Sequence, residues 1–119
     1  MREPIPLLEK RPVEQFHGPR VEIFDPPMCC PTGLCGPVIN PVLLDVNEMV
    51  LKLKGQGVIV ERYLMAQQPQ AFLNNADVYR LVREQQLAAL PITVVNGRVI
   101  KAGVYPTLDQ VRAALNGGN

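Results

Sequence analysis

The three cysteines of this 119-residue chain, Cys29, Cys30 and Cys35, all lie within one segment of seven residues. Cross-links inside so short a segment cannot tie distant parts of the chain together, so a hydrophobic core must hold the fold. Hydrophobic residues make up 47% of the sequence, which is ordinary for a single globular domain. In a reducing compartment, cysteines clustered in this way indicate a ligand-binding or redox site.

Charge and hydropathy provide no general attraction to nucleic acid or membrane, although a local charged patch remains possible, so partners must be argued from sites. A formal net charge of +1 gives no broad field that would attract nucleic acid or anionic lipid. Pro4, Pro6 and Pro12 interrupt the first residues, so no apolar run resembles a signal peptide. No segment approaches the roughly 20 apolar residues that cross a bilayer. We therefore expect a cytoplasmic protein that does not enter the membrane.

The chain divides into a terminal segment and one domain. Residues 1–19 are rich in proline and charge, and we expect them to form an arm or tail ahead of a domain spanning residues 20–116. Two interpretations of this arm stay open: a mobile terminus, or a segment that crosses a dimer or binds a partner.

The cysteine segment follows a short apolar strand. Residues 21–25 (VEIFD) have the β-branched and aromatic content of a buried strand, and Pro26 and Pro27 end it. Pro31 and Gly33 disfavour a regular helix or strand between the cysteines. The three sulfurs are therefore expected on a loop at the end of a strand.

A helix and a second strand are expected next. Asn40 can cap a helix that Pro41 begins, and Gly55 provides a stop. A second strand is predicted over residues 58–63, and a strand, helix, strand unit of this length favours a parallel pair with a right-handed crossover. The helical positions expected to face the core are Val42, Val46, Met49, Val50 and Leu53.

The next stretch predicts two helices. A short helical turn is expected after Pro69, and Asn75 caps a longer helix that runs to about Leu87. Its inward positions are Val78, Leu81 and Val82.

The last stretch predicts a hairpin and a final helix. Asn96 and Gly97 form a strong hairpin signal between PITVV and RVIKA, and Thr107 and Gln110 have the spacing of a capping box. The apolar stripe of the final helix is Leu108, Val111 and Leu115. The order of elements predicts an α/β, thioredoxin-like fold, with a mixed four-stranded sheet flanked by helices.

The chemistry of three thiolates narrows the ligand. Thiolate is a soft donor that selects copper(I), zinc or, by extension, trivalent arsenic and antimony. A closed zinc site usually needs four ligands, and His17, the one histidine, has no finger-like spacing from the cysteines. Trivalent arsenic carries a lone pair and forms three bonds to sulfur in a pyramid. Cys29, Cys30 and Cys35 therefore match As(III) or Sb(III) without any further residue.

Other interpretations of the cysteines stay open. Zinc could take three cysteines and a water, and a dithiol oxidoreductase could use two of the three sulfurs. Redox enzymes of this fold separate their two cysteines by two residues, whereas four residues separate Cys30 from Cys35. A disulfide between Cys29 and Cys30 would be strained, because neighbouring Cβ atoms do not readily reach the preferred torsion.

Some neighbouring residues carry less specific signals. The Leu90 to Pro91 step occupies the place of a cis-proline in thioredoxin-like folds, and the local sequence leaves cis and trans equally open. Met28 is either packing or a thioether near the metalloid. Gln67 and Gln68 are better explained as loop or capping residues than as chemistry. The arginines of the residue 75–87 helix, Arg80 and Arg83, are more simply a solvated face than a DNA-binding element.

At FDPPMCCPTGLCG the sequence resembles the ArsD family of arsenical resistance proteins. Three further segments agree with that family in order: ERYLMAQQPQAF, the LPITVVNG hairpin start, and KAGVYP. The resemblance covers roughly residues 20–116. It implies a thioredoxin-like homodimer that delivers trivalent arsenic or antimony to the ATPase subunit of an arsenite efflux pump. It also implies a metalloid-responsive repressor of the arsenical resistance operon, with operator DNA as a partner.

By the same resemblance, Cys29, Cys30 and Cys35 match the family's metalloid-binding cysteines. The arm before Arg20 is longer than the family's usual start, and the cysteine pairs that some members carry near the C-terminus are missing here. We therefore expect a carrier of As(III) or Sb(III) without a resident cofactor, rather than an enzyme. Two alternatives remain: a protein that is primarily a DNA-binding repressor released by arsenite, and a thiol-disulfide oxidoreductase.

Overall fold

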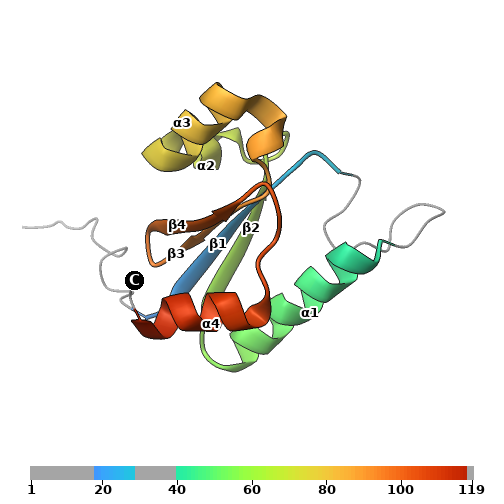
Figure 1. Cartoon of the computed structure of the whole chain (residues 1–119), viewed down its shortest axis with the longest axis vertical. Coiled ribbons are helices and arrows are strands. Elements are labelled where there is room, and N and C mark those ends of the chain that lie inside the picture. Colours follow the sequence, from blue (N-terminus) through green and yellow to red (C-terminus); the bar gives the residue numbers. More distant parts are fainter. Residues whose placement is uncertain (1–17, 29–39, 118–119) are drawn as a thin grey trace, which may run out of the picture.

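The computed structural model describes residues 18–28 and 40–117, which form one sheet with helices on both faces (Figure 1). In chain order the elements are β1 (Arg20–Asp25), α1 (Pro41–Gly55), β2 (Ile59–Leu64), α2 (Pro69–Asn74), α3 (Ala76–Gln85), the 3-10 helix η2 (Gln86–Ala89), β3 (Ile92–Val95), β4 (Arg98–Ala102) and α4 (Leu108–Gly117). The four strands lie in the order β2-β1-β3-β4. β1 and β2 are parallel, and the other two pairs are antiparallel. This mixed sheet is the thioredoxin-like arrangement that the sequence predicts.

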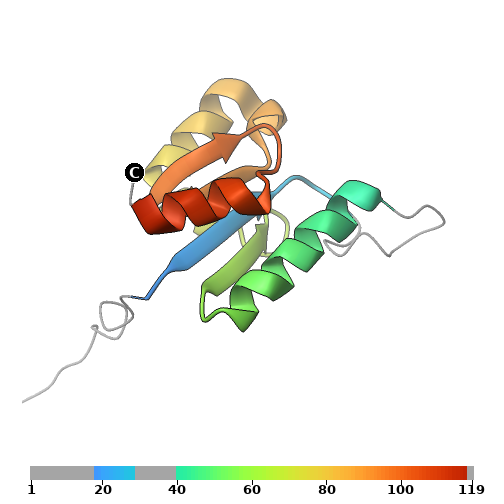
Figure 2. The same cartoon turned by 60° about the horizontal axis from the view of Figure 1, so that its bottom comes forward.

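The alternation of side chains along β1 divides the interior into two cores. Val21 and Ile23 face α1 and α4, whereas Phe24 faces α2 and α3. The helices cover the two faces accordingly, with α1 and α4 on one side and α2 and α3 on the other (Figures 1 and 2). On the second side, the ring of Phe24 contacts Tyr63 and Phe72 at centroid distances of 5.0 and 5.1 Å. β1 is therefore the central strand that both layers need.

The predicted caps and the hairpin turn form as expected. The side chain of Asn40 accepts hydrogen bonds from two amides in the first turn of α1, and Asn75 does the same for α3. Thr107 and Gln110 form a reciprocal capping box, with N to O distances of 3.0 and 3.1 Å. Asn96 and Gly97 both have positive φ, at 50° and 86°, which is the backbone of a type I′ hairpin turn.

The structure corrects two details of the predicted helices. Val42 is 55% exposed where it lines an open hollow between α1 and the start of α4, and Leu43 is buried instead. α1 does end at Gly55, as predicted, and the left-handed position after the helix belongs to Gly57 at φ 89°. The α-helical part of α3 ends at Gln85, and the residues that follow tighten into η2.

Two expectations concern the chain as a whole. Among residues 18–28 and 40–117, no helix is long and apolar enough to span a bilayer. The division into an arm at 1–19 and a domain at 20–116 stays a prediction, because residues 1–17 lie outside the part of the chain that the structure describes.

The hydroxyl of Thr93 is buried and has no hydrogen-bond partner among the described residues. A buried hydroxyl without a partner carries a desolvation cost, which valine of the same shape removes. Thr93→Val should therefore raise the free energy of unfolding by about 1 kcal/mol, measured by urea denaturation.

Thr107→Val is the matched control. It removes a hydroxyl that caps α4, so it should lower the free energy of unfolding by about 1 kcal/mol. A loss of stability in Thr93→Val would show that its hydroxyl does have a partner in the native protein.

Candidate metalloid site

The predicted ligands Cys29, Cys30 and Cys35 lie outside the described residues. The chain enters their segment after Met28, which is partly buried, and returns at Asn40, the cap of α1. The three-sulfur site therefore stays a prediction, and the structure describes its two flanks.

One end of the sheet gathers the segments on either side of the cysteines. Phe24 near the end of β1 pairs with Ile92 at the start of β3, so Pro91 lies beside the point where β1 ends. The Leu90–Pro91 bond is cis, which settles the isomer that the sequence left open. The carbonyl of Pro91 accepts a hydrogen bond from the amide of Gly103 at 2.9 Å, so the turn after β4 also reaches this end.

A carboxylate that the sequence analysis did not single out lies at the centre of this end of the sheet. Asp25 is fully buried as the last residue of β1, four positions before Cys29. Arg62 of β2 donates two hydrogen bonds to it, Nε to Oδ2 at 2.9 Å and Nη2 to Oδ1 at 2.7 Å. Tyr105, from the segment after β4, donates its hydroxyl to Oδ1 at 2.5 Å. The buried charge is thus paired and hydrogen-bonded on both oxygens.

This network fixes the ionisation of Tyr105. Burial raises the pKa of the Tyr105 hydroxyl above its ordinary value of 10.0, and the hydrogen bond to the Asp25 carboxylate raises it further. The tyrosine therefore stays protonated and keeps donating at any physiological pH. Gly103, at φ 90°, supplies the left-handed turn that leads the chain from β4 toward Tyr105.

The sequence carried a signal for this network. Along β1 the alternation of Val21 and Ile23 continues to Asp25, and along β2 the buried Val60 predicts that Arg62 faces the same side. Two polar residues at inward positions of paired strands indicate a buried ion pair. Tyr105 could not be found in this way, because only the tertiary fold brings it under β1.

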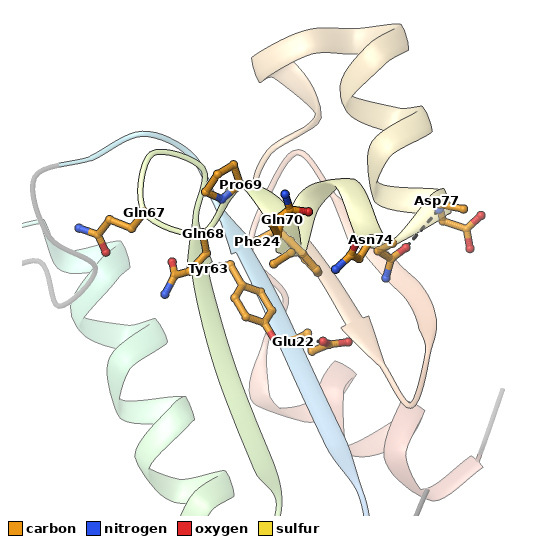
Figure 3. Close-up of a pocket in the computed structure, with 12 residues that line it drawn as sticks. Glu22, Phe24, Tyr63, Gln67, Gln68, Pro69, Gln70, Asn74 and Asp77 are labelled. Carbon is orange, nitrogen blue, oxygen red and sulfur yellow. Dashed lines mark hydrogen bonds between the residues drawn. The ribbon is translucent and has the colours of Figure 1, made fainter. Parts of the chain in front are cut away.

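A second polar group lies on the opposite face of the sheet, above Phe24 (Figure 3). The Tyr63 hydroxyl is 2.6 Å from Glu61 Oε1 and 3.1 Å from Glu22 Oε2. Arg20 lies farther from these two carboxylates, with Nη2 at 3.5 Å from Glu22 and 3.3 Å from Glu61. Beside them is a hollow of about 780 Å³, which Glu22, Tyr63 and the amide side chains around α2 line.

The remaining candidates behave as structural residues. The Gln68 side chain accepts a hydrogen bond from the Leu64 amide at 2.9 Å, which closes the loop after β2. Arg80 is exposed beside Asp77 at 3.5 Å, and the exposed Arg83 lies over the ring of Tyr79. Within residues 18–28 and 40–117, no group of three His, Cys, Asp or Glu side chains could hold a metal ion.

Comparisons with known sequences agree with the resemblance at the cysteine segment. A family model described as "Arsenical resistance operon protein ArsD" matches residues 19–117. Two sequences from Escherichia coli, both named arsenical resistance operon trans-acting repressor ArsD, are 38% and 39% identical to this chain over 84 residues. Each alignment covers 71% of this chain and 70% of the relative.

A solved structure has the same fold. The crystal structure of an arsenical resistance operon trans-acting repressor from Bacteroides vulgatus superposes with a TM-score of 0.73 at 41% sequence identity. The match covers 86% of this chain and 95% of that chain. At 41% sequence identity, the two chains are related in sequence as well as similar in fold.

Asp25→Asn should destabilise the fold strongly. The change keeps the shape of the side chain but removes the negative charge that pairs with the Arg62 guanidinium, whose side chain is 12% exposed. Breaking one side of a buried pair costs about 3 kcal/mol or more, which chemical denaturation would measure. Asp45→Asn makes the same change at an exposed position of α1 and should stay within about 0.5 kcal/mol of the unchanged chain. If Asp25→Asn and Asp45→Asn had equal free energies of unfolding, the Asp25–Arg62 pair would not stabilise the fold as argued.

Tyr105→Phe should alter the dependence of stability on alkaline pH. The folded pKa of Tyr105 is raised, so its contribution to stability is complete below the ordinary value of 10.0 and is lost as pH rises above it. The stability difference between the unchanged chain and Tyr105→Phe should therefore narrow as pH rises from about 10 to about 12. A difference that stays constant over this range would rule out the raised pKa.

Proposed function

Because the chain belongs to the ArsD family of arsenical resistance proteins, we propose that it binds trivalent arsenic or antimony through Cys29, Cys30 and Cys35. We propose further that it passes the metalloid to the ATPase subunit of an arsenite efflux pump. The observation that carries the proposal is the coincidence of the family match over residues 19–117 with three thiols in one short segment.

The number of sulfurs supports the choice of ligand. Three thiolates saturate the pyramidal coordination of As(III), whereas a closed zinc site would need a fourth donor. Bringing together groups six residues apart costs only about 1.6 kcal/mol in loop closure, so one segment can supply all three bonds. Three adjacent thiolates repel one another, which keeps the empty site largely protonated. Binding should therefore release protons.

Transfer to the partner proceeds in this proposal by stepwise thiol exchange. A thiolate of the ATPase subunit attacks arsenic, one As–S bond to this chain breaks, and the leaving sulfur takes up a proton. Arsenic keeps three sulfurs throughout and no oxidant or reductant is consumed. This path needs no enzyme activity, in agreement with relatives that are named as repressors.

A second function, regulation of the resistance operon, is favoured by the names of the relatives. Both Escherichia coli sequences and the Bacteroides vulgatus structure are described as trans-acting repressors. In this proposal a homodimer binds operator DNA, and arsenite bound by the same three cysteines releases it. Carrier and repressor then share one metalloid site. The thiol-disulfide oxidoreductase alternative draws no comparable support.

Replacing Cys29, Cys30 or Cys35 singly by Ser should weaken arsenite binding by about a hundredfold or more in a titration of the reduced protein, because each change removes one As–S bond. Thr32→Ser alters the same segment without removing a sulfur and should bind like the unchanged chain. X-ray absorption of the loaded protein should count three sulfurs. Undiminished binding in one cysteine variant, or oxygen in the shell, would end the three-thiolate proposal.

The repressor function is tested separately. A gel shift with operator DNA should show a complex of the reduced protein that arsenite dissociates, and the cysteine variants should keep the complex but lose the response. Failure to bind operator DNA would contradict the proposed repressor function, and the proposed carrier function would still stand. Analytical ultracentrifugation of the same samples tests the homodimer.

A further inference from the structure

Two glutamates face each other directly across the β1–β2 pair. Glu22 and Glu61 are partners in the register of these parallel strands, and both side chains lie on the face opposite α1 and α4. Like charges directly opposite on neighbouring strands destabilise a sheet. A sequence optimised for stability alone would avoid this pair, so it requires an explanation from function.

The surrounding residues only partly compensate the two charges. The Tyr63 hydroxyl has one proton and lies between both carboxylates, so it donates to one at a time. Burial, and then the hydrogen bond to Glu61, raise the Tyr63 pKa, so this donor stays neutral. Arg20 supplies one positive charge at 3.3 to 3.5 Å, with 39% of its side chain exposed. Within the described part of the chain, the two carboxylates and the single guanidinium beside them carry a net negative charge.

Glu22 lines an open hollow that has room for a protein side chain, and Glu61 lies next to it on the other side of the Tyr63 hydroxyl. The hollow measures about 780 Å³, with Phe24 on its floor and Glu22, Tyr63 and Asp77 around it (Figure 3). Gln67, Gln70 and Asn74 add side-chain amides that have no hydrogen bond within the described residues. Amides of this kind can pair with the backbone of an incoming segment, while the carboxylates pair with a cation.

We propose that this hollow receives an arginine or lysine side chain from the ATPase subunit of the efflux pump, and that Glu22 in its lining, together with the neighbouring Glu61, anchors the incoming cation. The inference rests on the proposed function, because it takes the ATPase as the partner. Docking there would place the partner beside the loop after β2, at the same end of the sheet from which the cysteine segment leaves.

Charge decides between a protein and other occupants. DNA and anionic membranes present phosphates, which the carboxylates of Glu22, Glu61 and Asp77 would repel. A guanidinium matches two neighbouring carboxylates with paired hydrogen bonds, and its planar group can stack on the ring of Tyr63. Arg20 already shows that a guanidinium fits beside these two carboxylates.

The test is the affinity of the arsenite-loaded chain for the purified ATPase subunit, measured by calorimetry. The double variant Glu22→Gln, Glu61→Gln keeps acceptor oxygens for Tyr63 but removes both charges, and it should bind on the order of tenfold more weakly. The loss should shrink at high salt, because added ions screen exposed charges. Glu84→Gln removes an exposed carboxylate of α3 that does not line the hollow, and it should bind like the unchanged chain.

Two further measurements separate the outcomes. The thermal midpoint of the double variant should equal or exceed that of the unchanged chain, because a like-charge pair has been removed, and its arsenite affinity should be unchanged.

ATPase binding that survives the double substitution would overturn the docking site and leave the proposed function standing. If the unchanged chain itself fails to bind the ATPase, both the docking site and the transfer step fall. Saturable binding of Mg²⁺ or Ca²⁺ that the double substitution abolishes would also overturn the inference.

Discussion

The buried carboxylate of Asp25 is the constraint on which the site end of the molecule depends. A charge this deep is tolerated only because Arg62 and Tyr105 hydrogen-bond both of its oxygens. Those donors come from the neighbouring strand and from the segment after the last strand, so one side chain ties three parts of the chain together. The cysteine segment begins four residues later in the sequence, after this anchored end of β1.

The two faces of the sheet have different tasks. α1 and α4 cover one face with an apolar core that stabilises the fold. On the other face α2 and α3 cover the part near β3, and the surface above β1 and β2 stays open, with Phe24 on its floor and Glu22 and Tyr63 around it. An incompletely covered face leaves polar side chains within reach of an incoming molecule, which is where a protein of this size has room for recognition.

In the proposed function, the carrier and the repressor use the same chemistry at the cysteines. A thiolate site that holds a metalloid through three exchangeable bonds can release it to another thiol or can report its presence to a second surface of the protein. The two tasks are compatible, because a metalloid that binds one state of the protein more tightly also changes the protein's affinity for a second partner. We therefore propose that one group of thiols, Cys29, Cys30 and Cys35, serves both tasks.

By itself, the sequence determined the order of elements, the caps at Asn40 and Asn75, and the hairpin at Asn96 and Gly97, because each depends on residues close together in the chain. It also supplied the hypothesis for the thiols through their spacing. Only the tertiary structure decided the strand order and brought Tyr105 to Asp25 across 80 positions. It likewise set Glu22 opposite Glu61, since the register of two strands depends on how a whole helix packs between them. Sequence patterns predict caps and turns because these depend on neighbouring residues. Contacts between distant segments form only when the helices pack against the sheet, so sequence patterns do not predict them.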